Sequence, residues 1–219
     1  MKIFKYLLMF IVPLYLLLVS IEYYSFNERF YESEFKKNNI SERTNINERD
    51  LRIIGRGIID YIKGDGDNLE LKIASLNYKE VFREEEKSHM LDVKRIYAYG
   101  SKVKNAIFIL MIIIILILFL KNKKTLLEGL VGAGIFSISF VAILFLMISI
   151  DYYKYFTYFH KLFFKDGTWT FDEKESLLIN ILPLDFFQHI TVRIVLMFLI
   201  SSLLVSVTSY IIKKNKLPS

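Results

Sequence analysis

Three histidines are the side chains in this sequence best suited to move protons near neutral pH: His89, His160 and His189. His160 belongs to an aromatic stretch, residues 159–172, that also holds the only tryptophan of the chain. A titratable ring in so apolar a setting indicates one of two things. It is either part of a reaction centre or an incidental histidine in an aromatic belt at a membrane interface.

His89 lies in a charged segment whose spacing is that of a helix. Glu85 precedes it by four residues and Asp92 follows it by three, so the three side chains share one helix face. Either carboxylate is then placed to hold the imidazole by its other ring nitrogen, as an orienting partner does for a general base. The alternative is an ordinary charged flank of an exposed helix.

Several chemistries are excluded or disfavoured by what the sequence lacks. The chain has no cysteine, hence no disulfide, thiolate nucleophile or thiolate metal ligand. No H-E-x-x-H pattern or comparable spacing accompanies the histidines, so we predict no metal site and no cofactor. Gly129, Gly132 and Gly134 lack the Lys-Ser/Thr that follows a phosphate-binding loop, and we expect them to let helices pack closely instead.

Composition indicates that much of the chain lies in lipid. Its 219 residues are 53% hydrophobic with a mean hydropathy of +0.36, too apolar for an ordinary soluble domain. Four apolar runs each approach the ~20 residues that a bilayer core requires, and we expect the first to be an uncleaved anchor. We predict an all-α integral membrane protein with a single membrane domain, 1–219, and spans at about 3–22, 103–120, 126–150 and 190–212.

Lysines flank these spans on one side if the four helices alternate. That side, which includes both termini, is cytoplasmic by the positive-inside rule. The loops at about 23–102 and 151–189, and with them all three histidines, are then extracytoplasmic. The net charge of +6 is spread over both sides and fits attraction to lipid head groups rather than to nucleic acid. The flanking lysines are Lys2, Lys5, Lys121, Lys123, Lys124, Lys213, Lys214 and Lys216.

The outer loops are expected to form an extracytoplasmic cap of amphipathic helices and an aromatic loop. Apolar residues at helical spacing follow Asn47, a suitable N-cap, and end at Gly64. A second helix is expected over about residues 78–99, with His89 on its apolar stripe, and Gly100 permits a break before the next span. A Lys-Asp-Gly turn should fold the aromatic stretch back toward the lipid.

Two stretches of this sequence resemble a known family. Residues 89–94, His-Met-Leu-Asp-Val-Lys, are similar to its motif His-Met-x-Asp-Val-Lys. Residues 159–172 are similar to its second block through Phe159-His160, Phe163-Phe164, Gly167, Trp169 and Phe171-Asp172. A looser match is Leu182-Pro183 followed by Phe186-Phe187. With these residues and its four spans, nearly the whole chain resembles the bacterial lipoprotein intramolecular transacylases, although His189 falls in none of the blocks.

The resemblance implies an enzyme of the bacterial cytoplasmic membrane. It would move the sn-2 acyl chain from the diacylglyceryl group of a lipoprotein's N-terminal cysteine to that cysteine's α-amino group, giving a lyso-form lipoprotein. Its partners would be the diacylglyceryl lipoprotein substrate and membrane lipid, and its catalytic pair would be His89 and His160. As supporting or substrate-binding residues we predict Glu85, Asp92, Lys94, Trp169, Asp172 and Arg193.

The residues suit this chemistry independently. An α-ammonium of pKa ~8 must lose a proton before it attacks an ester, and an imidazole of pKa ~6.5 can accept that proton. A second imidazole can stabilise the oxyanion and protonate the leaving alkoxide, and the sequence leaves open which histidine does which. Because amine and ester belong to one molecule, neither a cofactor nor an acyl-enzyme is required. We expect Phe159, Phe163, Phe164 and Trp169 to form an apolar wall that keeps water from His160.

Two alternatives remain at the level of sequence. One is a non-enzymatic membrane accessory or sensor protein whose histidines are structural or sense pH. The other, more remote, is a membrane hydrolase that uses zinc.

Overall fold

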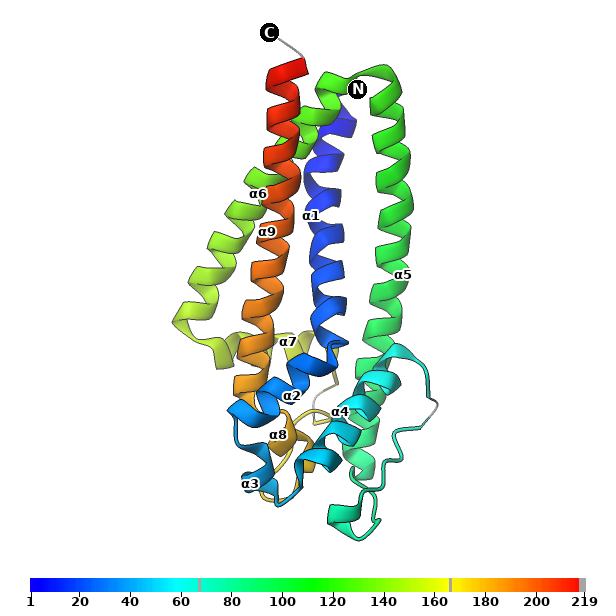
Figure 1. The fold of residues 1–219 in the computed structure, drawn as a ribbon, viewed down its shortest axis with the longest axis vertical. Coiled ribbons are helices and arrows are strands. Elements are labelled where there is room, and N and C mark those ends of the chain that lie inside the picture. Colours follow the sequence, from blue (N-terminus) through cyan, green and yellow to red (C-terminus); the bar gives the residue numbers. More distant parts are fainter. Residues whose placement is uncertain (67, 166, 217–219) are drawn as a thin grey trace. The chain divides into compact units, whose positions relative to one another are not determined.

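The structure of the protein is a computed structural model that describes residues 1–66, 68–165 and 167–216. Within these residues the chain is helical, with no strand and one isolated antiparallel bridge between Lys72 and Glu80. Figure 1 shows the elements in chain order. They are α1 (Lys2–Ser25), α2 (Glu28–Lys37), α3 (Ile40–Thr44), α4 (Glu48–Lys63), the 3-10 turn η1 (Ala74–Leu76), α5 (Glu84–Lys121), α6 (Lys123–Ile150), α7 (Tyr152–Phe163), α8 (Leu177–Ile181) and α9 (Leu184–Lys216).

Four helices are long and apolar enough to cross a membrane: α1, α5, α6 and α9. Each contains one of the predicted spans, so the prediction of an all-α protein with four membrane helices is confirmed. α5 is the longest because its apolar part follows a polar, charged beginning within the same helix. His89 lies in that polar beginning, ahead of the apolar segment predicted to span the bilayer.

The chain divides into two compact units, each described by itself. The first comprises Met1–Glu22, Ser101–Ile150 and the described residues from Val192 on, and the second comprises Tyr23–Gly100 and Asp151–Thr191. In the first unit the apolar parts of α1, α5, α6 and α9 run along one another (Figure 1). This unit therefore holds the predicted spans, and the second unit holds the predicted outer loops.

In the first unit, α6 packs closely against α1 and α9 at small residues. A Cβ atom added to Gly129 would lie 3.2 Å from the Cβ of Leu8 on α1. One added to Gly134 would lie 2.4 Å from the Cβ of Ser206 on α9. Helices in lipid associate through such close contacts because lipid tails are as apolar as the side chains they would replace. The prediction that these glycines serve helix packing is confirmed.

Polar side chains pair across helices within the same unit. Glu128 of α6 accepts from Lys5 of α1 at 2.9 Å and from Lys213 of α9 at 3.2 Å. The Ser137 and Ser202 hydroxyl oxygens lie 2.6 Å apart between α6 and α9. These pairs leave fewer polar groups without partners among apolar helices, where an unsatisfied group is expensive.

In the second unit, α4 is the amphipathic helix that the sequence predicts. The Asn47 side chain accepts from the backbone N–H of Asp50 at 2.9 Å, and Gly64 ends the helix with φ 96°. The apolar face of α4 lies in the core of this unit, together with side chains from α2, α5 and α8. The buried α4 residues with apolar side chains include Leu51, Ile54, Ile58, Ile59 and Ile62.

The second outer helix differs from the prediction. It begins at Glu84 rather than near residue 78, and it continues through Gly100 without a break. Glu86 explains the start, because its carboxyl group accepts from the Arg83 N–H at 2.7 Å as in a capping box. A single glycine within a long helix costs only ~1 kcal/mol relative to alanine, so it does not suffice to break one.

The segment after the third span was expected to be a loop, but its beginning is helical. Residues 152–163 form α7, which starts at the N-cap Asp151, whose carboxylate accepts from the Lys154 N–H at 3.0 Å. Phe159 to Phe163 of the aromatic stretch therefore belong to a helix. Of the expected turn, Gly167 has φ 83°, whereas Asp166 lies outside the described residues.

Gly134→Val should destabilise the protein by about 1–3 kcal/mol, because its side chain would press on the Ser206 Cβ, which cannot swing aside. The measurement is the melting temperature of the purified protein in detergent. Gly100→Ala is the matched control, since a Cβ there meets nothing within 4 Å and alanine favours the helix. Equal melting temperatures for Gly134→Val and the unmodified protein would contradict the close α6–α9 contact.

Candidate functional site

His89 and His160 come together in the second unit. The centroids of their rings lie 6.1 Å apart, and the ring planes are inclined by 22°. His89 comes from the polar beginning of α5 and His160 from the last turn of α7. The side chains are 8% and 9% exposed. Two imidazoles separated in this way can contact a single reacting group from two directions.

His160 is oriented by the backbone of its own helix. Its Nδ1 lies 2.8 Å from the carbonyl oxygen of Phe156, one turn earlier in α7. A carbonyl only accepts, so Nδ1 carries the proton, and in the neutral ring Nε2 is left as an acceptor. Burial lowers the pKa of His160, and the hydrogen bond to Phe156 partly offsets this. The ring is thus neutral near pH 7, with Nε2 ready to take a proton.

His89 is held in a more strongly perturbed state. Burial first, and then the charge of the nearby His160, lower its pKa to about 4, while Asp92 acts in the opposite direction. Its Nδ1 is buried and has no hydrogen-bond partner within residues 1–66, 68–165 and 167–216. A buried ring nitrogen without a partner is costly, which suggests that the missing partner belongs to a bound molecule.

Aromatic side chains surround the two histidines. Phe164 packs against both rings, with its centroid 4.7 Å from that of His89 and 5.3 Å from that of His160. Phe156 and Trp169 lie 4.3 and 4.9 Å from His160, and Phe171 lies 5.7 Å from His89. Of the predicted wall, Phe164 and Trp169 therefore lie against the pair. Phe156 and Phe171 line the site although the sequence did not single them out for this role.

Phe159 and Phe163 take a different place from the other two residues of the predicted wall. Phe159 still approaches His160, with centroids 5.6 Å apart, but it is 47% exposed. Phe163 packs on Phe159 at 4.8 Å and is half exposed. Both are therefore more exposed than Phe164, which packs against both histidine rings.

Glu86 is a buried carboxyl group that the sequence analysis did not single out. It is 0% exposed and accepts from the Ser176 hydroxyl at 2.6 Å and from the Leu178 N–H at 2.9 Å. With its bond to Arg83, it joins the start of α5 to the start of α8. The only sequence signal was its position three residues after the helix cap. Glu86 thereby fixes the helix that carries His89.

The two carboxylates predicted to orient His89 are engaged elsewhere. Glu85 is exposed and forms an ion pair with Arg83 at 3.3 Å. Asp92 forms an ion pair with Arg95 at 2.9 Å, and it reaches His89 only through its charge. Within the described residues neither is hydrogen-bonded to the His89 ring.

The other predicted supporting residues are dispersed. Lys94 donates to the carbonyl oxygen of Gly66 and lies over the Tyr61 ring, 4.6 Å from its centroid, so it ties α5 to the end of α4. Asp172 is exposed and accepts from the Lys174 N–H at 2.8 Å. Arg193 is exposed and belongs to the first unit. Among the predicted supporting residues, Trp169 is the one in ring contact with a histidine of the pair.

His189 does not join the pair. Its Nδ1 is hydrogen-bonded to Glu34, and its Nε2 lies 2.9 Å from the Lys37 ammonium. Glu34 is 6% exposed, so this contact satisfies a buried carboxyl group. His189 thus connects α9 to α2. Among the described residues, no group of three or more His, Cys, Asp and Glu side chains could hold a metal ion.

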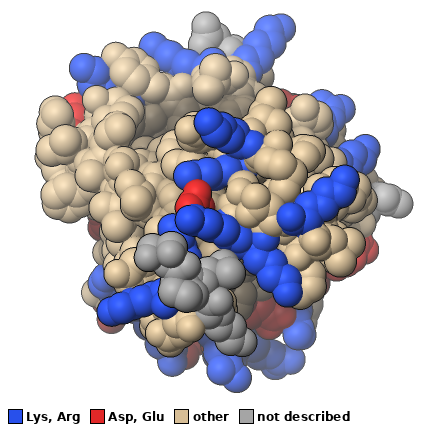
Figure 2. Space-filling view, turned by 90° about the horizontal axis from the view of Figure 1, so that it is seen from above, with Lys and Arg blue, Asp and Glu red and all other residues tan. Residues whose placement is uncertain are grey.

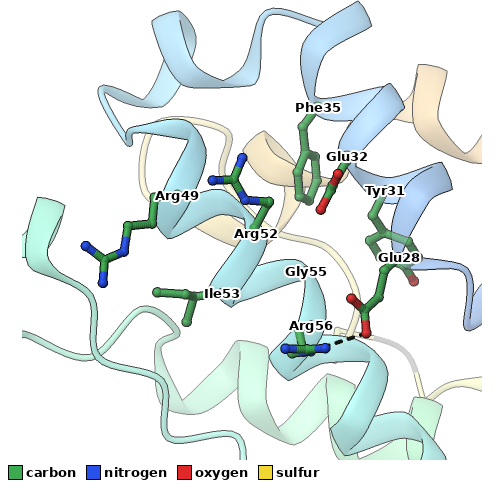
Figure 3. A pocket seen from close by; sticks show the side chains of 9 residues that line it. All are labelled: Glu28, Tyr31, Glu32, Phe35, Arg49, Arg52, Ile53, Gly55 and Arg56. Atoms are coloured by element: carbon green, nitrogen blue, oxygen red, sulfur yellow. Dashed lines mark hydrogen bonds and ion pairs between the residues drawn. The ribbon is translucent and has the colours of Figure 1, made fainter.

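Two cavities of the second unit lie away from the histidines. One of about 270 Å³ is lined by α2 and α4 residues, and Figure 3 shows Arg56 directed at Glu28, to which it is paired at 3.2 Å. A neighbouring cavity of about 330 Å³ is lined in part by Glu48, which pairs with Lys36 and Arg52. Neither lining contains His89 or His160. Charged side chains that line the two cavities pair with one another, as Arg56 does with Glu28 and Arg52 with Glu48.

Comparison with known proteins points to one family. The family model described as "Lipoprotein intramolecular transacylase Lit" matches residues 6–187. An uncharacterised protein of Aquifex aeolicus (strain VF5) is 28% identical over 192 residues, which cover 87% of this chain and 86% of that protein.

Solved structures show the same fold. The in meso structure of the membrane integral lipoprotein intramolecular transacylase Lit from Bacillus cereus matches with a TM-score of 0.84 at 24% identity, covering 99% of this chain and 98% of that one. A structure of the same protein with a histidine-to-alanine mutation matches with a TM-score of 0.80, covering 99% and 96%. The family match extends over most of the sequence and includes both histidine blocks. The chain belongs to the Lit family of lipoprotein intramolecular transacylases, and it is a membrane enzyme.

Proposed function

We propose that this enzyme transfers the sn-2 acyl chain of a diacylglyceryl-cysteine lipoprotein to the α-amino group of the same cysteine, with His89 and His160 as its catalytic pair. The observation that carries the proposal is the pairing of two buried imidazoles 6.1 Å apart among aromatic rings. Attack of an amine on an ester needs a base for the amine and a donor for the carbonyl oxygen. Family membership leaves no support for a non-enzymatic accessory or sensor protein.

His160 is best suited to be the base. The Phe156 carbonyl holds its Nδ1–H, so Nε2 presents a lone pair in a fixed direction. The imidazolium that forms keeps this hydrogen bond. It also lies in the last turn of α7, where the helix dipole favours a positive charge. His160 is therefore neutral before the reaction, and the hydrogen bond and the helix dipole stabilise it once it is protonated.

His89 is best suited to stabilise the oxyanion. With a pKa of about 4, it stays neutral near pH 7 and does not compete for the proton of the amine. A neutral imidazole N–H can donate to a developing oxyanion in an apolar site, where a hydrogen bond is worth more than in water. The two histidines thus have different roles, base and donor to the oxyanion, because their surroundings differ.

The reaction balances without a co-reactant. The amine nitrogen bonds to the sn-2 carbonyl carbon while His160 Nε2 takes the amine proton, and the carbonyl electron pair moves onto oxygen. When the intermediate collapses, the bond from carbon to the glyceryl oxygen breaks and His160 returns the proton to that oxygen. The products are an N-acyl amide and a free hydroxyl. Because both reacting groups belong to one molecule, orientation supplies much of the rate enhancement.

We also propose an orientation for the enzyme in the bacterial cytoplasmic membrane. Figure 2 looks onto the end at which α1 begins and α9 ends, where Lys and Arg side chains gather. By the positive-inside rule this end faces the cytoplasm, and the histidine pair is extracytoplasmic. Membrane lipid and the lipoprotein would then be the partners of the enzyme. Exposed lysines of the first unit near the helix ends include Lys2, Lys121, Lys123, Lys124 and Lys214.

Glutamine and alanine variants should distinguish the two roles. His160→Gln should lose acyl transfer as completely as His160→Ala, by at least ~10²-fold, because an amide cannot accept the amine proton. His89→Gln should keep more activity than His89→Ala, because its amide N–H₂ can still donate. The measurement is mass spectrometry of the N-terminal lipopeptide of a diacylglyceryl lipoprotein incubated with each variant.

His189→Gln serves as the control for these variants, since His189 is bonded to Glu34 rather than to the pair. It should retain transfer. Full transfer by both His89→Ala and His160→Ala would rule out the proposed catalytic pair.

The rate should depend on pH through the substrate rather than through the histidines. Between about pH 6.5 and 8, log kcat/KM should rise with a slope of one as the α-amine of pKa ~8 loses its proton. Neither histidine should add a titration near pH 6.5, because burial lowers both pKa values, that of His89 to about 4. Initial rates in buffers of constant ionic strength test this. A slope of two that sets in at about pH 6.5, as for an unperturbed imidazole, would contradict it.

Stability should depend on pH in the same range and provides a control. The His89 imidazole binds a proton with pKa ~6.5 when unfolded but about 4 when folded, so the unfolded chain holds more protons between these values. The contribution of neutral His89 to stability is therefore fully present above about pH 6.5 and is lost as the pH falls toward 4. Melting temperatures at each pH identify the range in which the rates report chemistry rather than unfolding.

A further inference from the structure

Three buried side-chain polar atoms have no hydrogen-bond partner among the described residues: His89 Nδ1, Thr157 Oγ1 and Trp169 Nε1. His89 belongs to the pair, and Thr157 lies on α7 one turn before His160. Leaving a buried polar atom without a partner costs about 1–3 kcal/mol, and native proteins keep few of them. His89 and Thr157 lie on the helices that carry the histidine pair, and the Trp169 ring packs against His160, which indicates that a bound molecule supplies the partners.

Trp169 has the most restricted chemistry of the three. An indole nitrogen only donates, so its partner must be an acceptor. The ring lies 4.9 Å from that of His160, and the neighbouring Phe156 and Phe164 side chains offer no acceptor. Among the acceptors of the proposed substrate, the sn-2 ester carbonyl oxygen is the one that becomes an oxyanion during the reaction.

We infer that Trp169 is a catalytic residue whose indole N–H donates a hydrogen bond to the oxyanion of the tetrahedral intermediate, beside the N–H of His89. This rests on the function proposed above. Two fixed neutral donors in an apolar site form an oxyanion hole, and each acts most strongly on the charge that develops in the transition state. The indole keeps its proton throughout, and the charge on oxygen disappears when the carbon–oxygen bond breaks.

The inference assigns to Trp169 more than an apolar surface. Phenylalanine would pack against His160 equally well, as Phe156 and Phe164 do. What an indole adds at this position is one N–H group. Removing the N–H while keeping the ring therefore separates the catalytic role from packing.

The composition of the chain makes this removal possible without other changes. Trp169 is the single tryptophan, so expression in a tryptophan auxotroph supplied with an analogue alters residue 169 alone. β-(3-Benzothienyl)alanine has the shape of tryptophan with sulfur in place of N–H. Ring-fluorinated tryptophans keep the N–H and make it more acidic. Each protein is assayed with a diacylglyceryl lipoprotein for kcat and KM, and its melting temperature is measured.

The benzothienyl protein should lose about 10²-fold in kcat with KM nearly unchanged, as expected when a donor that acts on the oxyanion is removed. The fluorinated proteins should keep or exceed the kcat of the unmodified enzyme, in order of N–H acidity. Trp169→Phe should resemble the benzothienyl protein, and Trp169→Ala should also raise KM because the packing surface is lost. A benzothienyl protein with unchanged kcat would overturn the inference.

The unmodified enzyme in the same assay distinguishes the two levels of the proposal. If it forms no N-acyl lyso-form lipoprotein, the proposed function fails and the inference with it. If it forms that product and the benzothienyl protein does so equally fast, only the role of Trp169 fails. Should Trp169→Phe unfold, the benzothienyl protein decides, because it preserves the shape of the ring.

Discussion

The removal of two imidazoles from water is the constraint on which the rest of the site depends. His89 and His160 are each less than a tenth exposed, and burial lowers the pKa of both. In water an imidazole titrates near pH 6.5, so a fraction of each ring would be charged near neutrality and repel the other. Enclosed by aromatic rings, both stay neutral, and one can accept a proton while the other donates. Phe164 serves this purpose well because it excludes water from both rings and offers no competing acceptor.

The two rings keep their positions only if hydrogen bonds hold the helices that carry them. Glu86 fixes the start of α5 by accepting hydrogen bonds from Arg83, Ser176 and Leu178. The Phe156 carbonyl fixes the His160 ring, and the cap on α7 sets where that helix begins. The first unit is held by different forces, close contacts at glycine and serine and charges paired around Glu128, because apolar side chains gain little by leaving lipid. Buried hydrogen bonds thus stabilise the second unit, whereas close helix contacts and paired charges stabilise the first.

Features with a local signal could be predicted from the sequence. The four apolar runs predict four helices, and Asn47 and Gly64 bound α4 because capping depends on the residues at the helix ends. Features that depend on competition between local and distant contacts were predicted wrongly. Gly100 suggested a break that the continuous α5 does not have, and the aromatic stretch predicted to be a loop begins within α7. Glu86 was not singled out, because a helical wheel cannot show that Ser176 and Leu178, some ninety residues later, supply its partners.

The sequence by itself determined the class of protein, the four spans and the two histidine blocks, since apolar length and motif residues are properties of the chain alone. Alternation of the spans also predicts that all three histidines lie on one side of the membrane. Only the tertiary structure decided that His89 and His160 meet while His189 bonds to Glu34. It likewise decided that neither Glu85 nor Asp92 orients the His89 ring in the described part of the chain. The physical reason is that a hydrogen bond or a desolvated pair requires contact within a few ångströms, and spacing along one helix does not specify what packs against it.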